Sequence, residues 1–160
     1  MSAMSRLLLS RALRAACAAV VLAAAPAAAA DACAAGADLV VRAGDPAPVP
    51  DGGSTLLHPA VTNAGGTATA VPFTLYVHLP PGVVGTGTSS GATCTTLPHG
   101  HTVACTVPAG LAPGASVTAE VRISVASGMD PEVLEGDVEA ALPDDPTPDD
   151  NRTTFRITVV

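Results

Sequence analysis

The chain has 160 residues and a formal net charge of −7, with 14 acidic side chains against seven arginines and no lysine. All of the acids follow residue 30, where four arginines remain, and this balance disfavours nucleic acid and anionic membranes as partners. Trp is absent, and the aromatic side chains are two Phe and one Tyr, too few for platforms that stack bases or sugars. We expect neither a nucleic-acid partner nor a cofactor.

The first thirty residues have the layout of a secretory signal peptide. Three arginines precede an apolar run over residues 15–30, which ends in alanines of the kind found at cleavage sites. The run has about 16 residues, which is short for a bilayer span of about 20. We expect a signal-peptide helix at 1–30 and an exported mature chain, residues 31–160, that forms one domain without a membrane span. An uncleaved anchor or a buried Ala-rich helix is the alternative interpretation.

Alternation of apolar and polar residues predicts seven strands in the mature chain, because period two places one side of a strand on a core and the other in water. In chain order they cover residues 38–43, 54–63, 71–79, 102–107, 117–125, 133–142 and 154–159. The alternation is clearest in the third, the fifth and the last, where we expect Val71, Val117, Val121 and Phe155 to face inward. Pro59 indicates an edge strand or a bulge within the second strand.

Turn-forming clusters separate these segments, and no helical period occurs after residue 30. The clusters include Pro50–Gly53, Asn63–Gly66, Leu111–Gly114 and residues 143–151, which are rich in Pro, Gly, Asn or Asp. Short strands with regular turn signals predict an all-β fold, an immunoglobulin-like antiparallel β-sandwich of about seven strands.

Three of the four cysteines lie in the mature chain, because Cys17 leaves with the signal peptide. Cys94 and Cys105 bracket a short segment, and in an oxidising compartment we expect them to form a disulfide. Closing so short a loop is expected to stabilise the fold by about 3 kcal/mol. Cys33 is left over as a free thiol, an intermolecular link or a lipid attachment point, the last disfavoured because the residues before it lack the usual lipoprotein pattern.

The order of several short motifs resembles the immunoglobulin-like repeat of bacterial surface proteins known as domain of unknown function 11. The motifs are Ala37–Val41, Val61–Asn63, Leu79–Val83, Cys94 with Val103–Cys105, Leu111–Val117 and Asp149–Asn151. The first half is also similar to the related cell-adhesion domain of bacteria. The resemblance implies an adhesive or spacer role in the cell envelope and no catalytic residues. The sequence departs from the family pattern at His58–Pro59.

Two groups of residues are candidate metal ligands. His99 and His101 lie one residue apart between the two cysteines and could share Cu or Zn, although a tight site needs further ligands from His58, His78 or neighbouring acids. The second group, in a Pro-rich loop, offers the hard oxygen ligands that Ca²⁺ prefers. Its members are Asp144, Asp145, Asp149, Asp150 and Asn151. Ordinary solvated side chains are the competing interpretation of both groups.

The segment Gly87–Gly91 matches the Gly-x-Ser-x-Gly pattern of hydrolase nucleophiles, with Ser89 at its centre. That chemistry needs a strand before the serine and a helix after it, whereas this segment is predicted to be a Gly- and Ser-rich loop. We therefore predict a non-catalytic module, secreted or held in the cell envelope, that binds or spaces a protein or envelope component. The alternative is a small secreted carrier that binds a ligand or metal through the Cys94–Cys105 hairpin and its histidines.

Overall fold

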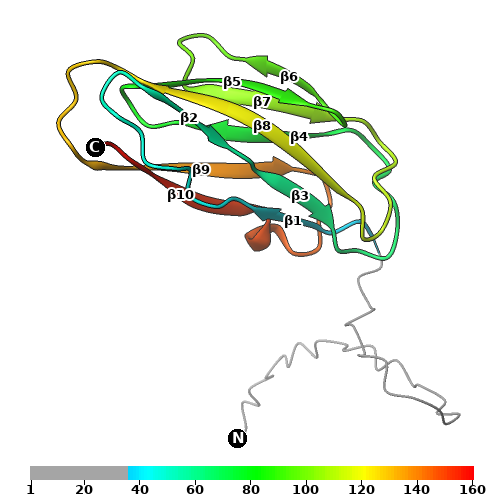
Figure 1. Ribbon diagram of the computed structural model, residues 1–160. Helices are drawn as coiled ribbons and strands as arrows, with labels where there is room; N and C mark the ends of the chain where they lie inside the picture. Colours follow the sequence, from blue (N-terminus) through cyan, green and yellow to red (C-terminus); the bar gives the residue numbers. More distant parts are fainter. Residues whose placement is uncertain (1–35) are drawn as a thin grey trace, which may run out of the picture.

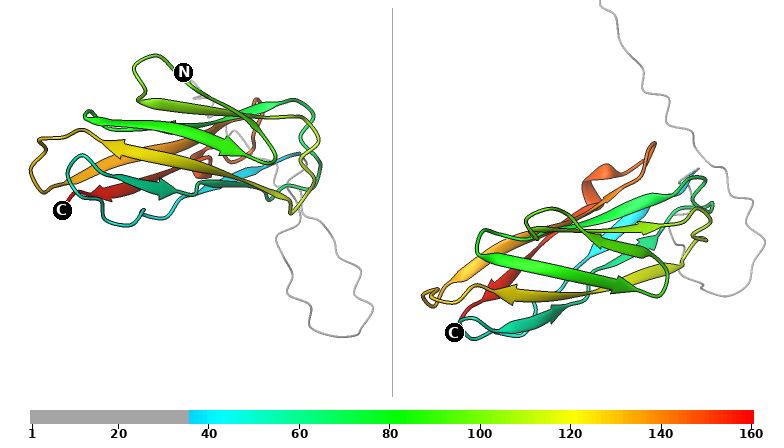
Figure 2. Two further views of the ribbon diagram at one scale, coloured as in Figure 1. Left: turned by 45° about the horizontal axis from the view of Figure 1, so that its top comes forward. Right: turned by 90° about the horizontal axis from the view of Figure 1, so that it is seen from above.

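The computed structural model describes residues 36–160, which form two β-sheets packed face to face (Figure 1, Figure 2). The predicted signal peptide and Cys33 lie outside the described residues. The described part contains ten strands and one short 3-10 helix, and the ladders between named strands are antiparallel. The all-β sandwich predicted from the sequence is therefore confirmed, with more strands than the seven expected.

The first sheet is built around its longest strand, β8. The strand order is β1–β3–β8–β2, and β5 pairs with the other side of β8. The strands are β1 (Leu39–Arg42), β2 (Ser54–Leu57), β3 (Ala60–Asn63), β5 (Val83–Ser89) and β8 (Ser116–Val125).

The predicted strand 54–63 is divided into β2 and β3 at His58–Pro59. Both halves pair with β8 in one continuous register, from Ser54 opposite Ser124 to Thr62 opposite Ser116. The Pro59 carbonyl still accepts a hydrogen bond from the Ala119 amide at 2.9 Å, but proline has no N–H to return one. The missing donor interrupts the ladder without a shift of register, so the bulge considered for this position does not occur.

The second sheet has the order β10–β9–β4–β7–β6. Its strands are β4 (Phe73–His78), β6 (Thr93–Thr96), β7 (Thr102–Val107), β9 (Val133–Ala141) and β10 (Arg152–Thr158). The 3-10 helix η1 (Pro148–Asp150) precedes β10. The predicted disulfide between Cys94 and Cys105 is confirmed, and it joins β6 to β7.

Strands β5 and β6 were not predicted, because their residues look like those of a loop. In β5, Gly85 and Gly87 face the neighbouring sheet at very short range. A Cβ atom on Gly85 would lie 2.7 Å from Leu79 Cδ1, and one on Gly87 would lie 2.5 Å from Val103 Cγ1. Glycine is required here so that the strand can approach the β6–β7 hairpin, and its presence hides the strand from propensity arguments.

The core between the sheets consists mainly of aliphatic side chains. Val121, Phe155 and the alternate residues that follow them are buried, as predicted. The inward orientation expected for Val71 was wrong, because Val71 precedes β4 and is 43% exposed, whereas Val117 is half-buried and packs against the core as expected.

Candidate functional site

The serine of the hydrolase-like motif is positioned by backbone hydrogen bonds. Ser89 is the last residue of β5, and so it lies in a strand where a loop was expected. Its hydroxyl donates to the Thr118 carbonyl at 2.9 Å and accepts from the Gly91 amide at 3.2 Å. Both hydrogen-bond partners of this hydroxyl are backbone groups, and neither is a basic side chain.

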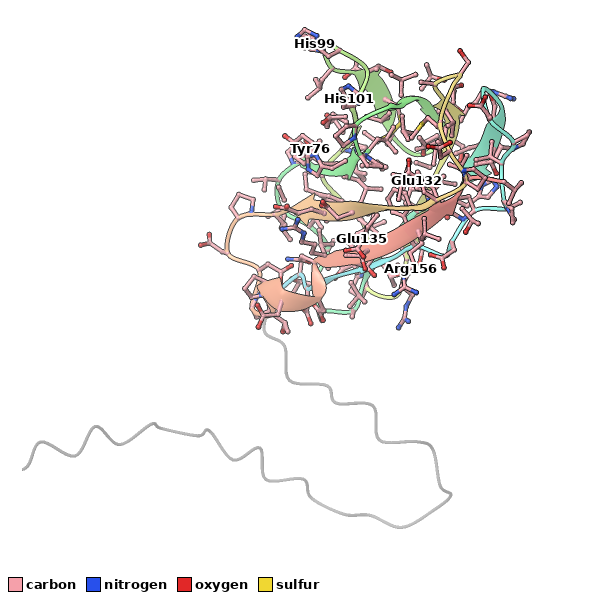
Figure 3. All side chains as sticks on the ribbon, turned by 90° about the vertical axis from the view of Figure 1, so that its left-hand side faces the viewer. Tyr76, His99, His101, Glu132, Glu135 and Arg156 are labelled. Carbon is pink, nitrogen blue, oxygen red and sulfur yellow. A yellow bond between two sulfur atoms is a disulfide. The ribbon has the colours of Figure 1, made fainter. Side chains whose placement is uncertain are left out.

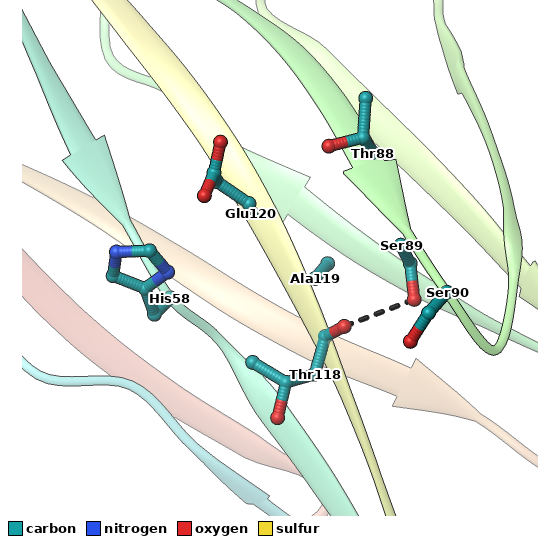
Figure 4. Close-up of a pocket in the computed structure, with 7 residues that line it drawn as sticks. All are labelled: His58, Thr88, Ser89, Ser90, Thr118, Ala119 and Glu120. Atoms are coloured by element: carbon teal, nitrogen blue, oxygen red, sulfur yellow. Dashed lines mark hydrogen bonds between the residues drawn. The ribbon is translucent and has the colours of Figure 1, made fainter.

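A shallow hollow of about 310 Å³ surrounds Ser89, with His58 and Glu120 also in its lining (Figure 4). His58 follows β2, whereas Ser89 ends β5, and these strands flank β8 on opposite sides. Two strand spacings separate their backbones by about 10 Å. The geometry therefore does not place His58 as the base of a Ser89 nucleophile.

The two hairpin histidines have different environments. His99 is exposed at the turn between β6 and β7 and has a left-handed backbone, with φ 72°. His101 is half-buried, and its Nδ1 donates to the Val83 carbonyl at 2.7 Å. Figure 3 shows His99 at the tip and His101 nearer the sheet. Within residues 36–160, neither histidine belongs to a group of three ligands close enough to share a metal.

The predicted calcium ligands are only partly brought together. Asp145 and Asp150 form a group with Asp38, in which one carboxylate oxygen of each lies within 4.8 Å of the others. Asp144 and Asp149 are exposed and do not join this group, and Asn151 is buried. The calcium site stays a prediction, and Asp38 is the member of this group that was not named from the sequence.

Electrostatic repulsion operates within this group, which we call the acidic corner (Asp38, Asp145 and Asp150). Burial raises the pKa of Asp38, and the charges of Asp145 and Asp150 raise it further. Burial and the Asp145 charge likewise raise the pKa of Asp150. Asp145 itself accepts from the Leu39 amide at 2.9 Å, whereas Asp38 Oδ1 and Asp150 Oδ1 are buried without a hydrogen-bond partner.

A third group lies on the outer side of the second sheet. It consists of His78 on β4 and of Asp137 and Glu139 on β9, whose ligand-capable atoms lie within 4.8 Å of one another. Arg152 Nη2 contacts Asp137 Oδ1 at 3.1 Å, while Asp137 Oδ2 is buried and has no partner. The His78 ring stacks on Tyr76, with centroids 5.9 Å apart.

From the sequence, His78 belongs to the predicted strand 71–79, and Asp137 and Glu139 belong to the predicted strand 133–142, but the pattern could not bring these residues together. Alternation shows which side of a strand a residue occupies, whereas it does not show which strand lies beside it or in which register. The antiparallel pairing of β4 with β9 sets His78 opposite Asp137 and Tyr76 opposite Glu139. This pairing creates the group.

The outer sides of the two sheets differ in chemistry. We call the outward side chains of β1–β3–β8–β2 and β5 the first face, and those of β10–β9–β4–β7–β6 the second face. On the first face, hydroxyls pair across strands: Ser54 with Ser124 at 3.1 Å and Thr62 with Ser116 at 2.7 Å. The first face also carries the exposed Glu120 and Arg122, whereas the second face adds Tyr76 to a larger set of ionisable side chains, and Figure 3 shows Tyr76, Glu135 and Arg156 over its strands.

Three edge strands have outward backbone groups that are already hydrogen-bonded. On β5, the Gly85 amide donates to the Gly100 carbonyl at 2.9 Å, and its carbonyl accepts from Thr96 Oγ1. On β10, the Arg156 amide donates to Asp45 Oδ1 at 2.7 Å, and on β1 the Leu39 amide is held by Asp145. Each of these contacts opposes the addition of a further strand at its own position on the edge.

Comparison with known proteins identifies the fold. No protein-family model matches the sequence, and no curated protein matches it either. Among solved structures, the third cohesin of ScaC from Acetivibrio cellulolyticus, solved in complex with the ScaB dockerin, has a TM-score of 0.53 and 12% identity, covering 76% of this chain and 99% of that one.

Two further structures are similar. The CARDB domain of a Pyrococcus furiosus protein, solved with di-metal ions, has a TM-score of 0.52 and 15% identity, covering 79% of this chain and 90% of that one. AvmM, which catalyses macrocyclization in alchivemycin A biosynthesis, has a TM-score of 0.48 and 17% identity, covering 75% and 88%. The chain thus has the immunoglobulin-like sandwich of cohesin and CARDB domains. At these identities the likeness establishes the fold alone.

No helix among the described residues has the length and apolar character needed to cross a membrane.

Proposed function

We propose that this chain is an exported, non-catalytic interaction module that binds a protein of the cell envelope through its second face. One observation carries the proposal: the second face gathers the chain's only tyrosine with a histidine, acids and arginines on neighbouring strands. The central residues are Tyr76, His78, Asp137, Glu139 and Arg152.

The composition of this face suits protein recognition. Tyr and Arg are enriched where protein partners bind, because each buries a large area and also makes directional hydrogen bonds. Tyr76 is half-buried and held by its stack on His78, so little conformational entropy is lost when a partner covers it. Opposite charges lie side by side, with Glu135 opposite Arg156, and this arrangement can select a partner of complementary pattern.

The similar cohesin structure supports a protein partner, since that module is solved with a dockerin bound to it. The Cys94–Cys105 disulfide supports export, because such bridges persist in oxidising compartments. Together with the signal-like residues 1–30, these features favour a module that works outside the cytoplasm, either released or held at the cell surface.

The hydrogen bonds of Ser89 support a role without catalysis, because its hydroxyl is committed to backbone groups of β8 and of its own turn. The contact between His101 and the Val83 carbonyl likewise disfavours the hairpin carrier. One nitrogen of that imidazole is used to hold β7 against β5. This contact therefore assigns His101 a structural role.

The experiment captures the partner and then compares the two faces. Purified mature chain, residues 31–160, is immobilised and exposed to solubilised envelope proteins of the cells that secrete it. The captured protein is purified, and its affinity is measured for wild type, Tyr76→Ala and Arg156→Ala on the second face, and Arg122→Ala on the first. Arg156 and Arg122 are both exposed strand arginines, so the last two variants form a matched pair.

We expect Tyr76→Ala to weaken binding by about tenfold or more, as removal of a central interface tyrosine does. Arg122→Ala should change the affinity by less than about twofold, as substitutions away from an interface do. Loss of binding in Arg122→Ala with full binding in Tyr76→Ala would contradict the proposal. An esterase activity that Ser89→Ala abolishes would contradict its non-catalytic part.

A further inference from the structure

We infer that His78, Asp137 and Glu139 form a binding site for a divalent transition metal, with Zn²⁺ as the representative ion. These residues supply one imidazole and two carboxylates, and one ligand atom of each lies within 4.8 Å of the others. The set differs from the acidic corner, which offers oxygen alone, and from His99 and His101, which lack a third ligand within the described residues.

The backbone holds the three ligands in place. His78 lies directly opposite Asp137 across the β4–β9 ladder, and Glu139 is the next outward residue on β9. Directly opposed side chains in an antiparallel pair have Cβ atoms about 5 Å apart. Both strands lie inside the second sheet, with β7 beyond β4 and β10 beyond β9, so the ligands stand on rigid elements. Such placement favours a defined coordination geometry.

Asp137 shows the clearest sign of an absent partner. Its Oδ1 is bound by Arg152 Nη2 at 3.1 Å, but its Oδ2 is buried and has no hydrogen-bond partner. An ionised oxygen removed from water without a partner is costly, and a cation bound there would remove that cost. Arg152 would then orient the liganding carboxylate from behind, as second-layer partners do at metal sites.

His78 is also held in a manner suited to metal binding. Its Nδ1 is hydrogen-bonded to Thr102 Oγ1 at 3.3 Å, an arrangement in which Nε2 is the nitrogen left to bind a metal. The stack on Tyr76, with 12° between the ring planes, restricts rotation of the imidazole. Two neighbours, Thr102 and Tyr76, therefore fix the ring before any metal arrives.

The ligand set decides which metal class fits. An imidazole nitrogen disfavours Ca²⁺ and Mg²⁺, which take oxygen ligands, whereas Zn²⁺ accepts both nitrogen and carboxylate oxygen. Three protein ligands leave a fourth tetrahedral position open, to be filled by water or by a group from another molecule. The half-buried position on a sheet surface allows that molecule to approach.

The test measures Zn²⁺ binding to metal-free mature chain by calorimetry at neutral pH, with Glu139→Gln, Asp137→Asn and His78→Ala as site variants. His99→Ala and His101→Ala are the control variants, because they remove histidines outside the site. Circular dichroism verifies that each variant is folded. Glu139→Gln preserves shape while it removes the charged ligand, so it serves even where His78→Ala disturbs the strand.

We expect one equivalent of Zn²⁺ to bind with a Kd of about 10 µM or tighter, and each site variant to weaken it about tenfold or more. Zn²⁺ should also raise the thermal midpoint of the wild type, since a ligand that binds only the folded state stabilises it. This rise should be absent in Glu139→Gln. Absence of binding by folded wild type, or binding lost in His99→Ala and retained in Glu139→Gln, would overturn the inference. The assay contains no protein partner, so its outcome is independent of the proposed interaction.

Discussion

The two faces of this sandwich differ in how their outward polar side chains find hydrogen-bond partners. On the first face, short hydroxyl side chains satisfy one another across strands, as Ser54 and Ser124 do. On the second face, ionisable side chains crowd together, and Asp137 keeps a buried oxygen without a partner. The polar groups of the first face, including Glu120 and Arg122, are exposed to water, whereas Asp137 Oδ2 on the second face is buried. The contrast is consistent with the proposed binding role of the second face.

This contrast depends first on each strand having one inward and one outward side. The sharpest test is Val121→Asp, since Val121 is fully buried in β8. An unpaired charge would enter the core, and we expect a loss of about 4 kcal/mol or more, a large part of the roughly 5–15 kcal/mol that stabilises a typical domain. Urea denaturation followed by circular dichroism measures the loss.

The control is the neighbouring Glu120→Gln on the first face, whose side chain is exposed. It should shift the free energy of unfolding by less than about 0.5 kcal/mol. Equal midpoints for Val121→Asp and Glu120→Gln would show that β8 does not separate core from solvent.

The disulfide bounds the second face at β6, and its removal is the next largest effect. The double substitution Cys94→Ser, Cys105→Ser should lower the free energy of unfolding by about 3 kcal/mol, because the unfolded chain gains the entropy of an open loop. Wild type unfolded in a reducing agent should match the double variant. Identical urea midpoints for oxidised wild type and double variant would exclude a stabilising role for the bridge.

A substitution at the tip of the β6–β7 hairpin should have a smaller effect, and it should stabilise the fold. His99 has a left-handed backbone, with φ 72°, which glycine adopts without steric cost. We expect His99→Gly to stabilise the fold by about 0.5–1 kcal/mol, whereas His99→Ala, which keeps a Cβ, should not. Thermal unfolding measures both. A destabilised His99→Gly would indicate that the imidazole makes a contact which outweighs the strain.

Asp51 and Asp38 show the same contrast between a carboxylate with hydrogen-bond partners and one with a buried oxygen that has none. Their substitutions have the smallest expected effects. Asp51 accepts from the Gly128 and Met129 amides, and these hydrogen bonds lower its pKa from the ordinary 3.8. Its contribution to stability is therefore present above pH 3.8 and is lost as the pH falls through the folded-state pKa. The pKa of Asp38 is raised instead, so its contribution is present below pH 3.8 and is lost as the pH rises through the folded-state pKa.

At pH 7, Asp51→Asn should lower the thermal midpoint slightly and Asp38→Asn should raise it slightly, because exposed charges are screened by solvent. Each difference should shrink as the pH falls through the folded-state pKa of its carboxyl, above 3.8 for Asp38 and below 3.8 for Asp51, because the carboxylate then becomes neutral. Midpoint shifts of the same sign in the two variants would contradict the assigned hydrogen bonds and repulsion.

Much of the fold was predictable because alternation in segments such as 71–79 and 117–125 follows directly from one-sided burial. The strand β5 was not, since Gly85 and Gly87 are set by a close approach to another sheet, which only the folded structure shows. The disulfide followed from short spacing between cysteines. These three cases separate local information from information that depends on tertiary packing.

The candidate site was harder to predict from the sequence, because it also depends on tertiary packing. Asp145 and Asp150 are near in sequence and were named together, but Asp38 reaches them only through packing of β1 beside η1. His78 and Asp137 come from strands whose pairing no local pattern specifies. Both lie in predicted strands, 71–79 and 133–142, and the missing information was the register between β4 and β9.

The central claim is that binding occurs on the second face, and a residue-resolved NMR map with the captured partner tests it most directly. Backbone amide shifts of the isotope-labelled mature chain are followed as unlabelled partner is added. We predict that the largest changes fall at Tyr76, Glu139 and Arg156, with little change at Ser54, Thr118 and Arg122. Changes concentrated on the first face, with the second face unaltered, would contradict the account.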